Sequence, residues 1–300
     1  MSRVATVFLA TGLQGGSAID ALLKDGTFTP RAVTRSAGSA AARALASKGV
    51  EIAEAALNDK AAVARAVAGA ECVFLATIPS SAVSEVDQGV NVINASKDAG
   101  VKFIVFSSLP SISAISNGKY THAKEFDDKD AIRQYLEKSG VPCASIHPGN
   151  FLENYSRGIL DCPFEKTKSG YVLNTHEPEG CAGAQTWIGH DMGPAVLALF
   201  KHYDTHLPQI DKQTFVLGSQ RATAEEVAAE FAKGLGKGVE VRRRGKTGYP
   251  PMDDMYDAIT EFDIFPGAQV PDKRLEAFGV RVGTLEEFAR TVLKEGVAEA

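Results

Sequence analysis

The stretch ATGLQGG at residues 10–16 decides the fold class, because it joins an apolar run at residues 4–9 to a helical pattern at residues 17–24. Glycines in such a turn let the backbone approach a pyrophosphate closely, and the free N–H groups of the helix start attract its charge. A tight turn without a ligand is the alternative. The stretch predicts a phosphate site formed by Thr11, Gly12, Leu13, Gln14 and Gly15.

Leu9 stands where the usual glycine-rich fingerprint has its first glycine. A leucine side chain at this position could crowd the turn or an adenosine bound beside it. The sequence therefore leaves a second interpretation open, in which the site binds a dinucleotide poorly or stays empty.

Short apolar runs alternate with helical stretches throughout the first half of the chain. The runs lie at residues 4–9, 31–34, 50–53, 72–77, 102–107 and 143–147. Parallel neighbouring strands need crossover helices, so this alternation predicts an α/β fold, a doubly wound parallel-sheet Rossmann domain at residues 1–155. The alternation then stops, and we expect a smaller C-terminal α+β lobe for the substrate or partner at residues 156–300.

Composition excludes several classes of protein. The chain has 300 residues, of which 44% are hydrophobic and 23% charged, so disorder and fibrous structure are excluded. Its 32 Lys and Arg against 37 Asp and Glu give a net charge of −5, which argues against nucleic acid or an anionic membrane as a partner. The four cysteines form no CxxC pair, and we expect no metal site, no signal peptide and a cytoplasmic location, with the nucleus as the alternative.

The end of the second apolar run carries Arg35 where an NAD-selective protein would hold the ribose hydroxyls with Asp or Glu. A guanidinium can grip a 2′-phosphate with two hydrogen bonds and stack on adenine. Arg35 therefore favours NADP(H) over NAD(H) as the cofactor. The alternative is an arginine that is simply solvated in a loop.

Further motifs extend almost from end to end, and together they resemble those of the NmrA-like family, an atypical branch of the short-chain dehydrogenase/reductase superfamily. They are ATGLQG at residues 10–15, VTR at 33–35, VFLAT at 73–77, AGVK at 99–102, FSS at 106–108, SGVP at 139–142, PGNFLEN at 148–154, DMG at 191–193, LGK at 235–237 and TLEEF at 284–288. The resemblance implies an NADP(H)-binding Rossmann domain with a cleft toward a small C-terminal lobe.

The resemblance also implies two kinds of function. Some members of the family reduce small carbonyl, imine or conjugated substrates with NADPH, and this is the leading hypothesis for the chain. Others bind the dinucleotide without turnover and act as redox sensors that engage a regulatory protein partner, which is the alternative hypothesis.

The same resemblance places the family's lysine at Lys129, which would hold the nicotinamide ribose and act in catalysis. Active short-chain dehydrogenases pair this lysine with a tyrosine four residues earlier, where this chain has Glu125. A carboxyl group cannot replace a phenol as a general acid unless its pKa rises by several units.

A second candidate for the catalytic tyrosine is Tyr120, which forms a Y-x-x-x-K pattern with Lys124 and follows Ser107 and Ser108. The competing interpretation is a loop aromatic beside the cleft. Two loops after predicted strands are expected to flank the nicotinamide. The alternative is that their prolines and small residues only form turns and contact no cofactor. Their residues are Thr77, Ile78, Pro79, Pro148 and Asn150.

Overall fold

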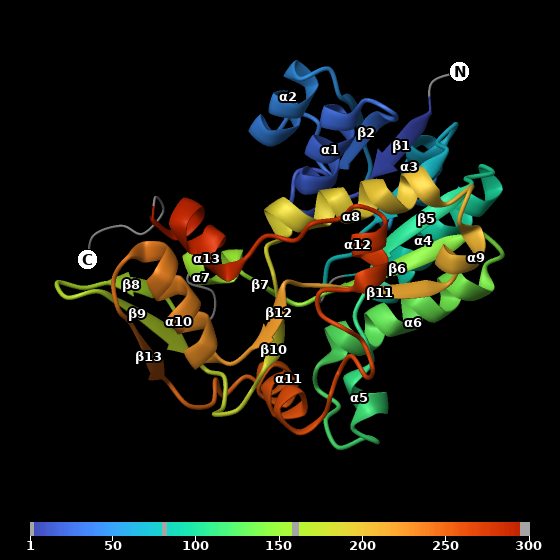
Figure 1. Ribbon diagram of the computed structural model, residues 1–300. Coiled ribbons are helices and arrows are strands. Elements are labelled where there is room, and N and C mark those ends of the chain that lie inside the picture. Colours follow the sequence, from blue (N-terminus) through green and yellow to red (C-terminus); the bar gives the residue numbers. More distant parts are fainter. Residues whose placement is uncertain (1–2, 80–82, 158–161, 295–300) are drawn as a thin grey trace.

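A computed structural model describes residues 3–79, 83–157 and 162–294. Its centre is a parallel sheet of seven strands in the order β11-β6-β5-β4-β1-β2-β3 (Figure 1). The strands are β1 (Val4–Val7), β2 (Thr29–Thr34), β3 (Glu51–Glu54), β4 (Cys72–Leu75), β5 (Phe103–Ser107), β6 (Cys143–Pro148) and β11 (Gln213–Leu217). The chain order reverses between β1 and β4, which confirms the doubly wound α/β class.

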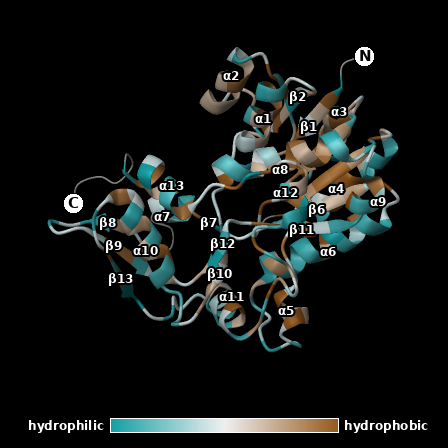
Figure 2. Ribbon diagram, in the orientation of Figure 1, coloured by the Kyte–Doolittle hydropathy of each residue, from teal (hydrophilic) through white to brown (hydrophobic). Residues whose placement is uncertain are grey.

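Alternation along the strands supplies a hydrophobic core on each face of this sheet. In β4, Cys72 and Phe74 belong to one buried cluster, and Val73 and Leu75 belong to the other. The first cluster packs against α1 (Leu13–Asp25), α2 (Ala40–Ser47) and α8 (Ile188–His202), and the second against α3 (Lys60–Val67), α4 (Glu85–Asp98) and α6 (Lys124–Lys138). Figure 2 shows hydrophilic residues along α6, on the outside of this layer.

The chain returns to this sheet after residue 155. Strand β11 pairs with β6, and α8 crosses α1 so closely that a Cβ on Gly193 would lie 2.1 Å from the carbonyl oxygen of Ser17. Helices α9 (Leu207–Ile210) and α12 (Lys273–Ala277) also lie on this side of the molecule (Figure 1). Residues before and after position 155 therefore both contribute to the large sheet and its helix layer. The division of the chain into two domains at residue 155 stays a proposal.

The smaller lobe is an α+β arrangement beside the large sheet (Figure 1). Its sheet has the order β13-β9-β8, with α10 packed on it, and a second three-stranded sheet, β12-β10-β7, lies between this lobe and the large sheet. The strands are β7 (Asn150–Phe151), β8 (Phe164–Lys166), β9 (Tyr171–Thr175), β10 (Gly183–Thr186), β12 (Gln220–Ala222) and β13 (Val239–Arg243). The remaining helices are α5 (Ile112–Ile115), α7 (Glu153–Arg157), α10 (Ala224–Leu235), α11 (Pro250–Glu261), α13 (Leu285–Phe288) and the π-helix η2 (Ala289–Leu293).

Candidate active site

The glycine-rich turn leaves the start of α1 open to an anion. Gly12 is the N-cap residue and provides no side-chain cap, and no acidic residue lies in the first turn. A Cβ on Gly15 would lie 2.3 Å from the carbonyl oxygen of Leu9, so only glycine fits there. The backbone N–H groups of the first turn therefore have no competing carboxylate and are available to a phosphate.

Leu9 adopts the backbone conformation of the glycine that it replaces. Its φ angle is +51°, in the left-handed region that leucine rarely occupies, and its side chain packs against the hydrophobic clusters on both faces of the sheet. The turn therefore keeps its tight shape without a glycine, at a backbone cost of about 1 kcal/mol.

Arg35 is exposed immediately after β2, the strand next to β1. The loops after β1 and β2 leave the same edge of the sheet, because the two strands are parallel. Arg35 thus lies at the same edge of the sheet as the start of α1. The guanidinium of Arg35 is exposed there and can contact a ligand.

Lys129 is held by a buried carboxylate that sequence analysis missed. The Nζ atom of Lys129 lies 2.5 Å from Oε1 of Glu85, at the start of α4, and the hydroxyl of Thr77 donates to the same oxygen at 2.6 Å. The exposed fractions of the Lys129 and Glu85 side chains are 12% and 2%. Glu85 is 44 residues from Lys129 in the chain, so no local pattern points to this ion pair.

A cavity of about 460 Å³ lies at the carboxyl ends of β5 and β6, between the large sheet and the smaller lobe. Its sheet side brings together four residues that the sequence predicted for the site, Gln14, Lys129, Pro148 and Asn150, and also includes Ser107 and Ser108. Its lobe side includes Tyr155, Cys162, Glu177, Cys181, Met255 and Tyr256. We call it the central cavity.

Hydrogen bonds order the sheet side of the central cavity. The hydroxyl of Ser107 donates to Oε1 of Gln14 at 2.5 Å, which links the end of β5 to the glycine-rich turn. The amide of Asn150 donates to Oη of Tyr155 and to Oε1 of Gln185, each at 3.2 Å. The cavity therefore touches both the predicted phosphate turn and α6, the helix that carries Lys129.

The three residues predicted for the loop after β4 lie away from the cavity wall. Thr77 lies behind Lys129 and reaches it through Glu85. Ile78 exchanges backbone hydrogen bonds with the side chain of Gln88, and Pro79 is exposed. Neither Ile78 nor Pro79 lines the central cavity.

Tyr120 is not brought to Lys129. Its hydroxyl donates to Oε1 of Glu261 on α11 at 2.6 Å, and the residue does not line the central cavity. Glu125, at the tyrosine position of the family, is half-buried on α6. Burial raises its pKa, while its own backbone N–H and the positive charge of Lys129 lower it. The described residues thus place no tyrosine on α6 one turn before Lys129.

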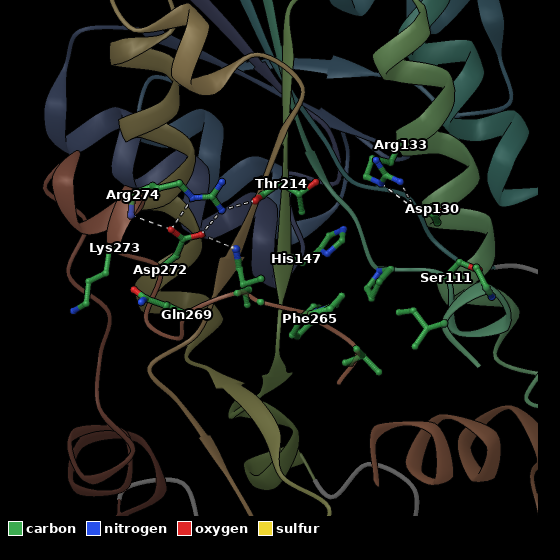
Figure 3. A pocket seen from close by; sticks show the side chains of 18 residues that line it. Ser111, Asp130, Arg133, His147, Thr214, Phe265, Gln269, Asp272, Lys273 and Arg274 are labelled. Atoms are coloured by element: carbon green, nitrogen blue, oxygen red, sulfur yellow. Dashed lines mark hydrogen bonds and ion pairs between the residues drawn. The ribbon is translucent and has the colours of Figure 1, made fainter. Parts of the chain in front are cut away.

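A second cavity, of about 650 Å³, lies beside β6 and β11. Figure 3 shows Asp130 and Arg133 on one side, Asp272 and Arg274 on the other, and His147 and Phe265 between them. Burial, helped by the charge of Arg133, lowers the pKa of His147 to about 3, so its ring is neutral. Asp130 forms an ion pair with Arg133, Asp272 with Arg274, and Lys273 with Glu276 outside the cavity wall.

Within the described ranges, no three His, Cys, Asp or Glu side chains gather in a way that could hold a metal ion. No helix in these ranges is long and apolar enough to cross a membrane.

Comparison with known proteins places the chain in a family. The model of the NmrA-like family matches residues 1–255. The NmrA-like family domain-containing oxidoreductase malD of Malbranchea aurantiaca is 29% identical over 251 residues, which are 77% of this chain and 74% of malD.

Two solved structures share the fold. NmrA, a negative transcriptional regulator, in complex with NADP has a TM-score of 0.81 at 20% identity, covering 97% of this chain and 95% of NmrA. The NADPH-dependent quinone oxidoreductase QOR2 of Escherichia coli, complexed with NADPH, has a TM-score of 0.71 at 23% identity, covering 97% of this chain and all of QOR2 (100%). With the family match over most of its length, the chain belongs to the NmrA-like family.

Proposed function

We propose that the chain is an NADPH-dependent oxidoreductase that acts on a small carbonyl, imine or conjugated substrate. The observation that carries this proposal is the central cavity, where Gln14 of the glycine-rich turn and Lys129 of α6 line one space at the carboxyl ends of the strands. The curated relative malD is named an oxidoreductase, and the NmrA and QOR2 structures contain NADP and NADPH. When bound, NADPH supplies a hydride to the substrate.

Each part of the cofactor has residues of matching chemistry. Thr11, Gly12, Leu13, Gln14 and Gly15 hold the pyrophosphate at the uncapped start of α1, and Arg35 binds the 2′-phosphate. Pro148 and Asn150 flank the nicotinamide from the end of β6, and the loop of Thr77, Ile78 and Pro79 does so from the end of β4.

Lys129 can bind the nicotinamide ribose without leaving Glu85. An ammonium group has three N–H donors, and the ion pair with Glu85 uses one of them. The Thr77 hydroxyl holds Glu85 in place, so the remaining donors of Lys129 keep a fixed direction.

One observation favours a second candidate function, a non-catalytic NADP(H) sensor that engages a regulatory protein. The Tyr120 hydroxyl is engaged by Glu261, and α6 has Glu125 at the tyrosine position, so neither of these two positions brings a phenol to Lys129. Either function is compatible with a cytoplasmic or nuclear protein, which we include in the proposal.

A cofactor titration tests the proposal. NADPH fluorescence is followed with the wild type, Arg35→Ala and the control Lys97→Ala, whose exposed side chain lies in the last turn of α4. Loss of a charge-assisted phosphate contact is expected to weaken NADPH binding about 10- to 100-fold in Arg35→Ala and to leave NADH binding unchanged. Equal NADH and NADPH affinities in the wild type contradict the role of Arg35.

Turnover separates the two candidate functions. NADPH absorbance is followed with a panel of carbonyls, imines and quinones. Oxidation that Tyr120→Phe leaves intact and Lys129→Met abolishes supports the reductase. Tight NADPH binding without turnover on the whole panel supports the sensor.

A further inference from the structure

Glu177 is a buried residue on the lobe side of the central cavity whose carboxyl group has no partner in the part of the chain that the structure describes. It follows β9, lines the cavity and is 9% exposed. Within residues 3–79, 83–157 and 162–294, no group donates a hydrogen bond to its carboxyl oxygens and no cation forms an ion pair with it.

The charges around Glu177 do not compensate it. Its nearest positive charge is Arg243 on β13, and that guanidinium donates to both carboxylate oxygens of Glu225 on α10, at 2.5 and 2.9 Å. Burial raises the pKa of Glu177 to about 7, with Arg243 lowering and Glu225 raising it. The negative charge of an ionised Glu177 therefore has no ion-pair partner among the described residues.

The lobe side of the central cavity also carries aromatic and sulfur-containing side chains. Burial, followed by the charge of Glu177, raises the pKa values of Tyr155 on α7 and Tyr256 on α11 and brings that of Cys181 to about 11. Met252 and Met255 on α11 complete this part of the wall. Aromatic rings and thioethers accept a flat apolar molecule, and tyrosine faces attract a cation.

We propose that the lobe side of the central cavity binds a protonated amine on an aromatic or otherwise apolar substrate, with Glu177 as its counter-ion. Leaving a carboxylate unpaired in a buried site costs several kcal/mol, and a ligand cation removes that cost. This inference deepens the proposed function and rests on it, because the amine is taken to be part of the molecule that the reductase acts on.

Matched ligands test the proposal by binding alone. Calorimetric titrations at pH 8 compare 2-naphthylmethylamine with 2-naphthylmethanol, which has the same ring and no charge. The proteins are the wild type, Glu177→Gln and the control Glu179→Gln, which removes an exposed carboxylate two residues away. The amine is expected to bind the wild type and Glu179→Gln about 10-fold or more tightly than the alcohol, and Glu177→Gln is expected to lose this preference.

Equal binding of amine and alcohol to the wild type overturns the proposal, as does a preference that survives in Glu177→Gln. Tighter binding of the alcohol also overturns it, because Glu177 would then act as a protonated donor. The same three proteins are titrated with NADPH, which Glu177→Gln is expected to bind normally. Absence of NADPH binding in the wild type defeats the proposed reductase while leaving the amine measurement readable, so the two failures are distinguishable.

Discussion

Two buried carboxyl groups, Glu85 behind Lys129 and Glu177 in the wall of the central cavity, differ in what surrounds them. Glu85 has a lysine at 2.5 Å and a threonine hydroxyl at 2.6 Å on the sheet side. Glu177 on the lobe side has no described hydrogen-bond donor. The difference teaches that the chain supplies a cation to Glu85, whose Oε2 atom is nevertheless buried without a hydrogen-bond partner among the described residues, whereas Glu177 is left without a cation for a ligand to meet.

The largest expected effect comes from breaking the completed pair. Lys129→Met keeps the length of the side chain but leaves Glu85 buried without a cation, which is expected to lower the free energy of unfolding by about 3–5 kcal/mol. Urea denaturation at pH 7 measures it. A loss below about 1 kcal/mol would show that Glu85 is not held as an ionised partner.

Two further variants sharpen this measurement. Adding Glu85→Gln to Lys129→Met removes the stranded charge, so most of the lost stability is expected to return while NADPH affinity stays low. Lys138→Met, which changes an exposed lysine on the same helix, is expected to stay within about 0.5 kcal/mol of the wild type.

The second effect concerns the uncompensated carboxyl group. Glu177 has a raised pKa of about 7 in the folded protein against an ordinary value of 4.5, so folding is favoured by its protonated form. That contribution is complete below pH 4.5 and is lost as the pH rises through about 7. Glu177→Gln is therefore expected to be more stable than the wild type by about 3 kcal/mol at pH 8, with the difference small at pH 4.5.

Denaturation of both proteins between pH 4.5 and 8 measures this difference. Glu179→Gln serves as the control, because its exposed carboxyl is expected to give a flat difference over the same range. If the difference in the free energy of unfolding between Glu177→Gln and the wild type also does not change with pH, then the charge of Glu177 is already balanced by a partner. The contrast with Glu85 would then disappear.

Local patterns were sufficient to predict six of the seven strands of the large sheet and the turn that starts α1. Each strand of the first half is a short apolar run between helical stretches, and ATGLQGG marks the start of α1 where the structure has it. Strand β11 was not predicted, because its pairing with β6 joins segments about 70 residues apart and depends on the return of the chain through α8.

Local sequence patterns predicted less of the candidate site than of the fold. Lys129 was predicted from the resemblance to the family, but Glu85 reaches Lys129, and Glu177 reaches the cavity, only through tertiary packing. The YTHAK pattern at residues 120–124 was a poor guide to geometry, because Tyr120 precedes α6 and its hydroxyl turns toward α11. Short motifs predict spacing along one helix, whereas a buried partner depends on how different elements pack.

The smallest expected effect concerns the backbone of Leu9, and it tests whether the glycine-rich turn on the sheet side holds the conformation that the structure gives it. Leu9 has a φ angle of +51°, which glycine adopts freely and alanine does not. Leu9→Gly and Leu9→Ala both lose the partly buried side chain, but only the glycine variant relieves the backbone. We expect Leu9→Gly to be more stable than Leu9→Ala by about 1 kcal/mol in thermal or urea unfolding, the reverse of the usual order of these two residues. If the alanine variant is the more stable one, the turn does not hold this conformation, and the helix start of α1 is not preformed for a phosphate.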